Sequence, residues 1–359
     1  MIRVLVIDDS ALMRKMIPQL LGASHELEVV GTAMDGLFAL KKMRELKPDV
    51  VTLDVDMPRM DGIETLRRIV EEFGTPVIMV SSLTERGATL TLQALELGAF
   101  DFVTKPQDAI SVHIKDIGEE LIAKVKAAYD NPLARLRTLK TVSNAVPRVK
   151  SVNKTVKTAE KVLAIGISTG GPNALSFMLP RLPADFPAAI LIVQHMPPGF
   201  TEMFAMRLNT NCAIEVKEAK DGDLVVPGRA LIAPGGRHLK IKRLPLGTIA
   251  VLSDTSPVNG HRPSADVLFR SVAAEYEGRK VTGLLMTGMG NDGAEGLGEI
   301  KNQGGMTIAQ DEKSSVVFGM PKTAIERNYV REIVSLAEMD AFLVKQFMGK
   351  EVSHGTAIN

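Results

Sequence analysis

The sequence has one cysteine, Cys212, almost no net charge and no long apolar run. A single cysteine excludes an internal disulfide framework and any zinc or iron–sulfur site built from several cysteines. The 43 Lys and Arg residues nearly balance the 42 Asp and Glu residues, which argues against a nucleic-acid surface spread over the whole molecule. No apolar run approaches the roughly 18 residues of a membrane helix, and the N-terminus begins as a strand-like run rather than a signal peptide. We therefore expect a cytoplasmic protein with no membrane insertion and no nucleic-acid partner.

The chain contains enough apolar residues for two hydrophobic cores. Its 359 residues suggest two domains at about 150 residues each, and the 45% hydrophobic and 24% charged residues are typical of a folded protein. The sharpest change in composition lies at residues 131–159, which hold seven basic residues and no acidic or aromatic ones. We interpret this stretch as an exposed linker. The alternative is a basic arm that binds acidic partners or nucleic acid, which the lack of aromatic residues for base stacking disfavours.

Short apolar runs alternate with helical patterns on both sides of this linker. Before it, strands are expected at 2–7, 50–55, 77–80 and 100–103, and helices at 12–21, 36–46, 63–73 and 89–97. After it, strands are expected at 162–167, 188–193, 230–233 and 281–286, and helices at 174–179, 265–274 and 294–302. The stretch 239–252 resembles a β-hairpin around Pro245-Leu246-Gly247. The alternation predicts two α/β domains with parallel sheets.

Polar side chains gather where the strands of the first domain end. Asp8 and Asp9 follow the first strand, Asp54 ends the second, Ser81 follows the third and Lys105 follows the fourth. The carboxyl ends of parallel strands share one edge of the sheet, so these groups are expected to converge. Carboxylates brought together would repel without a hard cation, and Mg²⁺ prefers oxygen ligands. A lysine and a hydroxyl opposite them would suit an incoming phosphoryl group.

These segments resemble the receiver domain of two-component response regulators over roughly residues 1–125. The resemblance rests on Val-Ile-Asp8-Asp9-Ser10, on Leu53-Asp54-Val-Asp-Met-Pro and on Phe102-Val-Thr-Lys105-Pro106. It implies a doubly wound, flavodoxin-like domain in which Asp54 accepts a phosphoryl group from a histidine kinase. The strand pattern alone does not choose between Asp54 and Asp56, and the Asp-x-x-Met-Pro spacing of the family selects Asp54.

The same resemblance assigns roles around the phosphoacceptor. It implies that Asp8, Asp9 and Asp54 hold Mg²⁺. Lys105 would contact the phosphoryl group, and the hydroxyl of Ser81 would move to bind it in the active state. Phe102 stands where many receivers have tyrosine, so its ring can change position but offers no phenol to hydrogen-bond.

A nucleophile motif opens the second domain. The strand at 162–167 runs into Ser168-Thr-Gly170-Gly171-Pro172, and Gly166-Ile-Ser168-Thr-Gly170 fits G-x-S-x-G, in which a sharp turn between strand and helix exposes a hydroxyl. The helix N-terminus beyond this turn would favour a developing oxyanion. A phosphate-cradling glycine loop is the competing interpretation. Against it, neither G-x-G-x-x-G nor Gly-Lys-Ser/Thr is present.

A serine nucleophile needs a base and an acid that orients the base. His195 follows the strand at 188–193, so it lies at the same sheet edge as Ser168. The strand at 281–286 ends at that edge before a Gly-rich turn that carries Asp292, with Asp266 and Asp254 as weaker candidates. The order Ser, His, Asp differs from the Ser, Asp, His of ordinary α/β-hydrolases.

Four segments strongly resemble the catalytic domain of chemotaxis protein-glutamate methylesterases. They are Ile165-Gly-Ile-Ser168-Thr-Gly-Gly-Pro, Gln194-His195-Met-Pro, His261-Arg-Pro-Ser-Ala-Asp and Met286-Thr-Gly-Met-Gly-Asn-Asp292. The resemblance implies a Rossmann-like parallel α/β esterase domain, carrying the hairpin, behind the receiver. The predicted boundaries are 1–125 for the receiver, 126–159 for the linker, 160–348 for the catalytic domain and 349–359 for a tail.

The resemblance also implies the reaction and its partners. The enzyme would hydrolyse glutamate γ-methyl esters on the cytoplasmic domains of methyl-accepting chemoreceptors, release methanol and deamidate specific receptor glutamines. His195 would act as base for Ser168, Asp292 would hold the imidazole, and no metal or other cofactor is expected for ester hydrolysis. The backbone N–H groups of Met289 and Thr169 are our candidates for the oxyanion hole. His261, Arg262 and Ser264 either shape the substrate groove or cap local structure.

Three other functions compete with this one. A receiver-linked adaptor would carry an inert hydrolase-like domain, and a transcriptional regulator would use the basic linker and show a helix-turn-helix pattern after the receiver. A nicotinamide-dependent oxidoreductase would need the glycine fingerprint that is missing here. The α/β pattern after the linker and the complete set of triad residues favour the esterase.

Overall fold

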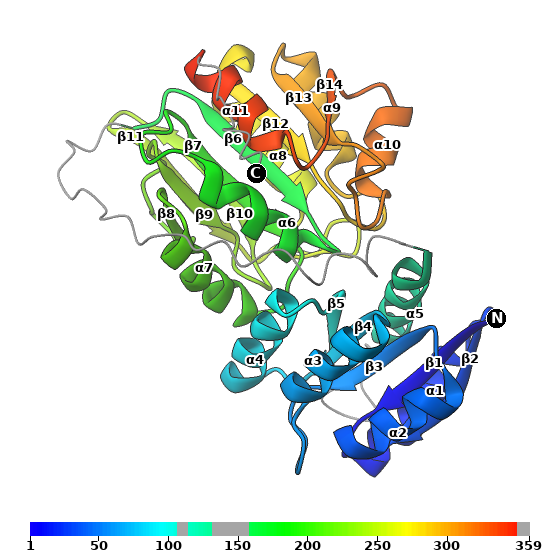
Figure 1. Ribbon diagram of the computed structural model, residues 1–359. Helices are drawn as coiled ribbons and strands as arrows, with labels where there is room; N and C mark the ends of the chain where they lie inside the picture. The colour runs from blue at the N-terminus through cyan, green and yellow to red at the C-terminus, as the bar shows by residue number, and fades with distance from the viewer. Residues whose placement is uncertain (106–113, 131–157, 350–359) are drawn as a thin grey trace, which may run out of the picture. The chain divides into compact units, whose positions relative to one another are not determined.

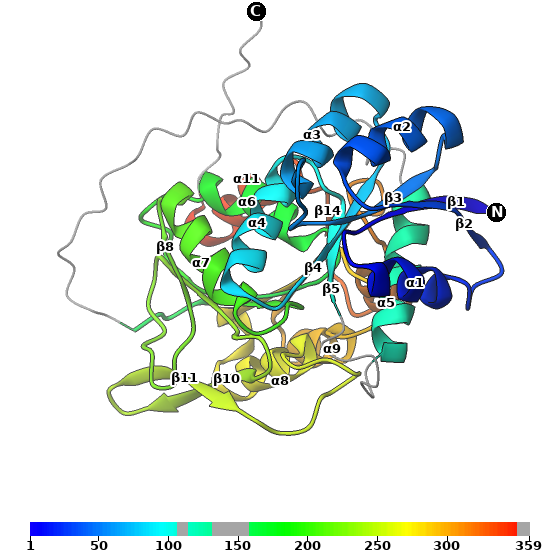
Figure 2. The same ribbon diagram turned by 90° about the horizontal axis from the view of Figure 1, so that it is seen from below.

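The computed structural model of the protein describes residues 1–105, 114–130 and 158–349 (Figures 1 and 2). The chain divides into two compact units, Met1–Asn144 and Ala145–Asn359. Both units are α/β with parallel sheets, as predicted. Within the described residues, no helix combines the length and the apolar character needed to cross a membrane.

The first unit is a parallel sheet of five strands in the order β2-β1-β3-β4-β5. Its strands are β1 (Ile2–Ile7), β2 (Leu27–Ala33), β3 (Val50–Asp54), β4 (Val77–Ser81) and β5 (Asp101–Thr104). Its helices are α1 (Ala11–Leu21), α2 (Gly36–Leu46), α3 (Gly62–Phe73), α4 (Glu85–Glu96) and α5 (Ile114–Asp130). Helix α1 packs against α5, and α2, α3 and α4 pack in series (Figure 1). The carboxyl ends of β1, β3, β4 and β5 therefore share one edge.

The end of this unit differs from the predicted boundary at residue 125. Helix α5 continues to Asp130, and Ala128 within it is fully buried. At the other end of the predicted linker, Ala159 is buried and its N–H donates to the carbonyl of Val225. Packing therefore extends into both margins of the predicted linker, while residues 131–157 lie outside the described part of the chain.

The second unit is a parallel sheet of seven strands in the order β14-β13-β12-β6-β7-β9-β8. These strands are β6 (Val162–Ile167), β7 (Ala189–Gln194), β8 (Glu215–Glu218), β9 (Arg229–Ile232), β12 (Val281–Leu285), β13 (Met306–Gln310) and β14 (Glu332–Val334). Its helices are α6 (Gly171–Met178), α7 (Phe200–Asn211), α8 (Ala265–Glu275), α9 (Ala294–Asn302), α10 (Met320–Glu326) and α11 (Met339–Met348). Short 3₁₀ helices occur at Leu179–Arg181 and Gly278–Lys280.

The predicted hairpin is confirmed. Strands β10 (His238–Leu244) and β11 (Gly247–Ser253) pair antiparallel as a separate ribbon that packs against α8 (Figure 2). The strand order then matters for function, because β12 and β7 flank β6 directly. The three strands whose ends carry Ser168, His195 and the Asp292 loop are therefore neighbours.

Candidate functional site

The carboxyl edge of the first sheet brings the predicted acidic residues and the lysine together. The Nζ of Lys105 lies 3.0 Å from Oδ2 of Asp8 and 2.7 Å from Oδ2 of Asp54. Asp8 and Asp54 are buried and Asp9 is exposed. Oxygen atoms of Asp8, Asp9 and Asp54 all lie within 4.8 Å of one another.

Local hydrogen bonds hold the loop that carries Asp8 and Asp9. The N–H of Ser10 donates to Oδ1 of Asp8 at 2.9 Å, and Ser10 caps helix α1. The guanidinium of Arg14 donates to the backbone carbonyls of Asp8 at 2.9 Å and Asp9 at 2.7 Å. The main chain of this loop is therefore fixed from the first turn of α1, and its carboxylates face the end of β3.

The charges in this cluster are unbalanced. Burial and, to a lesser extent, the neighbouring Asp8 raise the pKa of Asp54 to about 6, although Lys105 opposes both. Burial likewise raises the pKa of Asp8. Burial lowers the pKa of Lys105, but its contacts with Asp54 and Asp8 outweigh burial and leave that pKa raised. Three carboxylates with a single lysine form a donor set that fits a hard divalent cation such as Mg²⁺.

The remaining predicted residues of this unit lie nearby but do not all contact the cluster. The buried hydroxyl of Ser81 donates to the carbonyl of Ser82 at 3.4 Å, and no hydrogen bond to Asp54 is formed among the described residues. Phe102 is buried, and its carbonyl accepts a hydrogen bond of 2.6 Å from Lys124. Asp56 is exposed and pairs with Arg86, so Asp54 alone of the two acids lies in the cluster.

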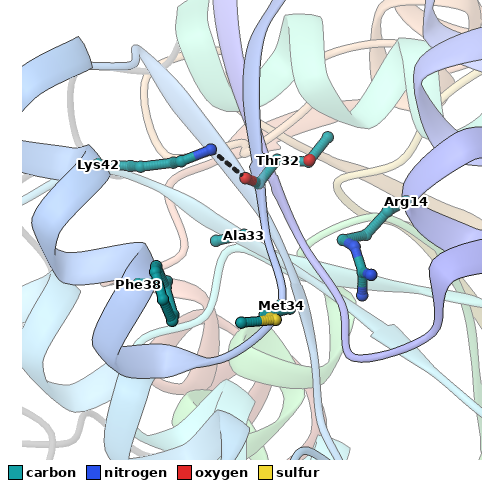
Figure 3. Close-up of a pocket in the computed structure, with 6 residues that line it drawn as sticks. All are labelled: Arg14, Thr32, Ala33, Met34, Phe38 and Lys42. Carbon is teal, nitrogen blue, oxygen red and sulfur yellow. Dashed lines mark hydrogen bonds between the residues drawn. The ribbon is translucent and has the colours of Figure 1, made fainter.

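A small cavity of about 230 Å³ lies in the same unit between α1 and α2 (Figure 3). Its lining residues are Arg14, Thr32, Ala33, Met34, Phe38 and Lys42. The Nζ of Lys42 donates to the carbonyl of Thr32 at 2.6 Å, and Arg14 donates to the carbonyls of Asp8 and Asp9, so the main chain engages both cations that line the cavity. It contains none of the predicted site residues, although Arg14 connects it to the Asp8 loop.

In the second unit, the turn after β6 presents Ser168. Gly170 has a φ of +74°, and a Cβ there would lie 2.5 Å from Cβ of Val316, so both the backbone and the packing require glycine. The N–H of Ser168 donates to the carbonyl of Thr287 at 2.9 Å, and the N–H of Gly171 donates to the carbonyl of Ser168 at 2.8 Å. The nucleophile turn is thereby held against the loop that follows β12.

His195 and Asp292 form the predicted pair. Nε2 of His195 lies 2.8 Å from Oδ2 of Asp292. The backbone N–H of His195 donates to the carbonyl of Ile167 at the end of β6. Nδ1 of His195 is buried and has no partner in the described structure. The imidazole ring stacks on His261, with centroids 3.9 Å apart and an interplanar angle of 14°. With Nε2 directed to Asp292, Nδ1 is the nitrogen left to exchange a proton.

Asp292 is 1% exposed and surrounded by hydrogen-bond donors from helix α8 and its preceding loop. Besides His195, the donors are Ser264 Oγ at 2.6 Å, the N–H of Ala265 at 2.7 Å, the N–H of Asp266 at 3.3 Å and Nδ2 of Asn259 at 3.2 Å. Burial by itself raises the pKa of this carboxyl, but the bonds from His195, Ser264 and Ala265 outweigh burial and hold the pKa well below its ordinary value. Asp292 is therefore an ionised carboxylate at a helix N-terminus.

The competing acids have other partners. Asp266 accepts bonds from the Gly296 N–H and from Nδ2 of Asn259, and burial raises its pKa. Asp254 is paired with Arg237. Neither forms a hydrogen bond with His195 among the described residues, so the geometry favours Asp292 as the orienting acid.

The candidate oxyanion donors border the nucleophile. A Cβ on Gly288 would lie 2.8 Å from Cβ of Ser168, which places the loop before Met289 against the serine. Within the described residues, the N–H groups of Met289 and Thr169 donate to no acceptor. Thr287 Oγ donates to the carbonyl of Thr169 at 2.9 Å, which fixes that peptide. These two N–H groups remain available to a substrate oxygen.

His261, Arg262 and Ser264, the three candidates for shaping the substrate groove, have different partners. Ser264 contacts Asp292 and His261 stacks on His195, whereas the Arg262 guanidinium donates to the carbonyls of Asp254 and Thr255 and closes a loop. Within the described residues, no hydrogen bond joins the Ser168 hydroxyl to His195. Sequence reasoning assigned no role to Asn259, Gln194 or Thr287, which support the site. A polar Gln194 ending an otherwise apolar strand beside His195 was a usable signal.

Comparison with known proteins adds to this geometry. Residues 163–343 match the CheB methylesterase family, and residues 4–115 match the response regulator receiver domain. The chain is 57% identical to "Protein-glutamate methylesterase/protein-glutamine glutaminase 2" of Koribacter versatilis, over 98% of each chain. It is 51% identical to the protein-glutamate methylesterase/protein-glutamine glutaminase of Halalkalibacterium halodurans, over 96% of this chain and 98% of that one. The solved catalytic domain of Thermotoga maritima CheB methylesterase is 41% identical, with a TM-score of 0.51, and the match covers 52% of this chain and 99% of that chain.

Proposed function

The chain belongs to the family of CheB methylesterases with an N-terminal receiver domain, and on that premise we propose that it is a phosphorylation-regulated protein-glutamate methylesterase. Its substrates are glutamate γ-methyl esters on the cytoplasmic domains of methyl-accepting chemoreceptors, and it deamidates specific receptor glutamines as well. Its place of action is the cytoplasm. The observation that carries the proposal is the buried His195–Asp292 pair at the sheet edge where β6 presents Ser168.

The proposed reaction begins with proton transfer from the Ser168 hydroxyl to Nδ1 of His195. The Ser168 oxygen attacks the ester carbonyl carbon, and the carbonyl oxygen becomes an oxyanion that the N–H groups of Met289 and Thr169 stabilise. Asp292 accepts the Nε2–H and stabilises the imidazolium. Collapse of the tetrahedral intermediate breaks the bond to the methoxy group, and His195 protonates the departing methanol.

The acyl-enzyme is then hydrolysed by the same groups. Water gives a proton to Nδ1 of His195 while its oxygen attacks the acyl carbon. The second collapse returns the proton from His195 to Ser168 and releases glutamic acid, which loses its proton to solvent and becomes the carboxylate. A glutamine substrate follows the same steps with ammonia as the leaving group. Each step uses side chains of this domain, and we expect hydrolysis by residues 158–359 to persist when divalent cations are chelated.

In this proposal, the first unit regulates the esterase activity of the second unit. We infer that Asp54 accepts a phosphoryl group from a chemotaxis histidine kinase, with Asp8, Asp9 and Asp54 holding Mg²⁺. When bound, Mg²⁺ neutralises charge on the carboxylates and on the incoming phosphoryl group. Lys105 and the Ser81 hydroxyl would contact that group, and Phe102 would change position with them.

The decisive test is methanol release from a methylated receptor fragment. The wild-type protein, phosphorylated with a small-molecule phosphodonor, should release methanol, and Ser168→Ala should not. Equal release by both proteins would overturn the serine mechanism. No release by either would leave the inert adaptor as the better interpretation.

A further inference from the structure

Gln194 occupies a position between the nucleophile and the base. It is the last residue of β7, is 2% exposed, and directly precedes His195. Its Nε2 donates to the backbone carbonyl of Ser168 at 3.0 Å and to the backbone carbonyl of His195 at 3.1 Å. One carboxamide therefore links the main chain of the proposed nucleophile to the main chain of the proposed base.

The contacts fix the orientation of this carboxamide. Turning the amide over would place Oε1 against two carbonyl oxygens and remove both hydrogen bonds. In the orientation observed, Oε1 is buried without a hydrogen-bond partner in the described structure. It lies against Gly171, where a Cβ would approach Oε1 to 2.0 Å. Gly171 does not have a positive φ, so the carboxamide and the neighbouring Ile167 side chain, rather than the backbone, exclude a larger residue there.

A buried amide oxygen without a partner weakens the folded state. A leucine of similar size would fill the same space without leaving a polar atom unpaired. The two donated hydrogen bonds are what leucine would lack, and both end on residues of the proposed triad. The contribution of Gln194 that a leucine cannot replace is therefore the spacing between Ser168 and His195.

We propose that Gln194 is a positioning residue that sets the separation between the Ser168 hydroxyl and the His195 imidazole. This inference rests on the proposed esterase function, because it concerns the geometry of that reaction. Gln194 itself does not touch the reacting atoms. Displacement of reacting groups by about 1 Å can cost about 100-fold in rate, so loss of the link should appear in kcat rather than in KM.

The first experiment compares wild type with Gln194→Leu in the full-length, phosphorylated protein. Two readouts are taken: methanol release from methylated receptor, and the rate at which a fluorophosphonate probe labels Ser168. We expect kcat and the labelling rate to fall about 10- to 100-fold while KM stays within about threefold. A folded Gln194→Leu protein with wild-type kcat and labelling rate would overturn the proposal.

The second experiment uses Gln194→Glu, which tests the link within one folded protein. A protonated glutamic acid can donate one hydrogen bond to a carbonyl, whereas a carboxylate can donate none. We expect partial activity at low pH and a loss of kcat as the introduced carboxyl group ionises. A carboxylate that acted only by its charge on the neighbouring His195 would stabilise the imidazolium. Activity would then return fully at higher pH, and that result would contradict the positioning role.

Gln310 provides a matched control. It is also buried at the end of a strand, β13, where its Oε1 accepts from the Thr287 N–H and its Nε2 donates to the carbonyl of Ser314. Gln310→Glu adds the same group to the same sheet and keeps the acceptor for Thr287. It should show no alkaline loss of kcat, and a parallel loss in both variants would overturn the proposal.

The two readouts separate failure of this inference from failure of the proposed function. If wild type releases no methanol but its Ser168 is labelled, the esterase assignment to receptors fails, and the labelling rates still test Gln194. If wild type releases methanol and Gln194→Leu matches it in both readouts, the positioning role fails and the esterase stands.

Discussion

The two units each place a buried aspartate at the carboxyl edge of a parallel sheet, yet the surroundings of the two carboxylates are opposite. Asp54 lies beside Asp8 and accepts one backbone N–H among the described residues, from Asp56 at 3.4 Å, together with its contact to Lys105. Asp292 accepts hydrogen bonds from His195, Ser264, Ala265, Asp266 and Asn259. The pKa of Asp54 is accordingly raised to about 6, with burial the largest cause. That of Asp292 is lowered because its donors outweigh burial.

The difference shows what each site needs from outside the chain. The donors to Asp292 all belong to the protein, so that carboxylate is stabilised as soon as the second unit folds. Among the described residues, Asp54 has only the Asp56 N–H and Lys105 as donors, so a bound cation would add interactions that the protein does not supply there. The first site is arranged to change its charge state with its ligands, and the second is arranged to keep its own constant.

The largest effect is expected when the proposed nucleophile or the proposed base is substituted. Ser168→Ala or His195→Ala should lower turnover of methylated receptor by about 10⁴-fold or more, because the nucleophile or the base is lost. Thermal unfolding should remain close to that of wild type, which shows that the loss is chemical.

The next largest effect is expected when Asp292, the carboxylate that accepts hydrogen bonds from His195 and the α8 region, is substituted. Asp292→Asn should lower turnover by about 10³-fold, because an amide can hold the imidazole in the wrong tautomer and cannot stabilise the imidazolium. The matched change in the other unit, Asp54→Asn, should leave basal turnover unchanged. Equal losses of basal turnover in Asp292→Asn and Asp54→Asn would contradict the different roles proposed for the two aspartates.

A smaller effect concerns regulation. A fragment that begins at Thr158 should be more active than the unphosphorylated full-length protein, and a phosphodonor should stimulate the latter by about 5- to 150-fold, equivalent to about 1–3 kcal/mol of coupling. Asp54→Ala should abolish the stimulation and keep the basal rate. Methanol release with and without phosphodonor measures both. A fragment no more active than the unphosphorylated whole would mean that the receiver acts only by positive contact.

The smallest effect is on stability without divalent cations. Asp54→Asn should stabilise residues 1–130 by about 1–2 kcal/mol at pH 7, since each unit of pKa difference is worth about 1.4 kcal/mol and the amide fits the cluster less well than a protonated carboxyl group does. Folded Asp54 holds its proton up to about pH 6, whereas an unfolded aspartate loses it near 3.8. Wild type should therefore lose stability relative to the variant between about pH 4 and 6. Urea denaturation at several pH values would measure the difference in free energy of unfolding between wild type and Asp54→Asn. A difference that stays constant from pH 3 to 8 would show that ionisation of Asp54 is not its cause.

Much of the fold follows from local sequence pattern, and the edge strands that were missed share a physical cause. The buried strands Ile2–Ile7 and Val162–Ile167 and the helix Gly36–Leu46 were predicted to the residue. Strands β2, β8 and β14 were missed, and each lies at the edge of a sheet, where one side is open and polar residues interrupt the apolar run. Strand β13 and helices α7, α10 and α11 were not predicted either.

The candidate sites divide in a similar way. Groups at strand ends, such as Asp54 and His195, could be predicted because strand direction alone brings them to one edge. Asn259 and Ser264 could not, since they reach Asp292 from a loop whose path depends on the packing of α8. Which nitrogen of His195 faces the acid also depended on the packing of the folded unit rather than on any spacing in the sequence.

The β10–β11 hairpin offers a practical attachment point for studying this enzyme. At one end, the imidazole of the buried His238 accepts from the N–H of Ser264, the residue whose hydroxyl contacts Asp292. At the other end, Leu246 in the turn is 97% exposed. An affinity tag or fluorescent label inserted there would leave the packed base of the ribbon undisturbed, because exposed loop tips tolerate insertions. A label at the exposed turn would thus be joined through this short hairpin to the loop that supports Asp292.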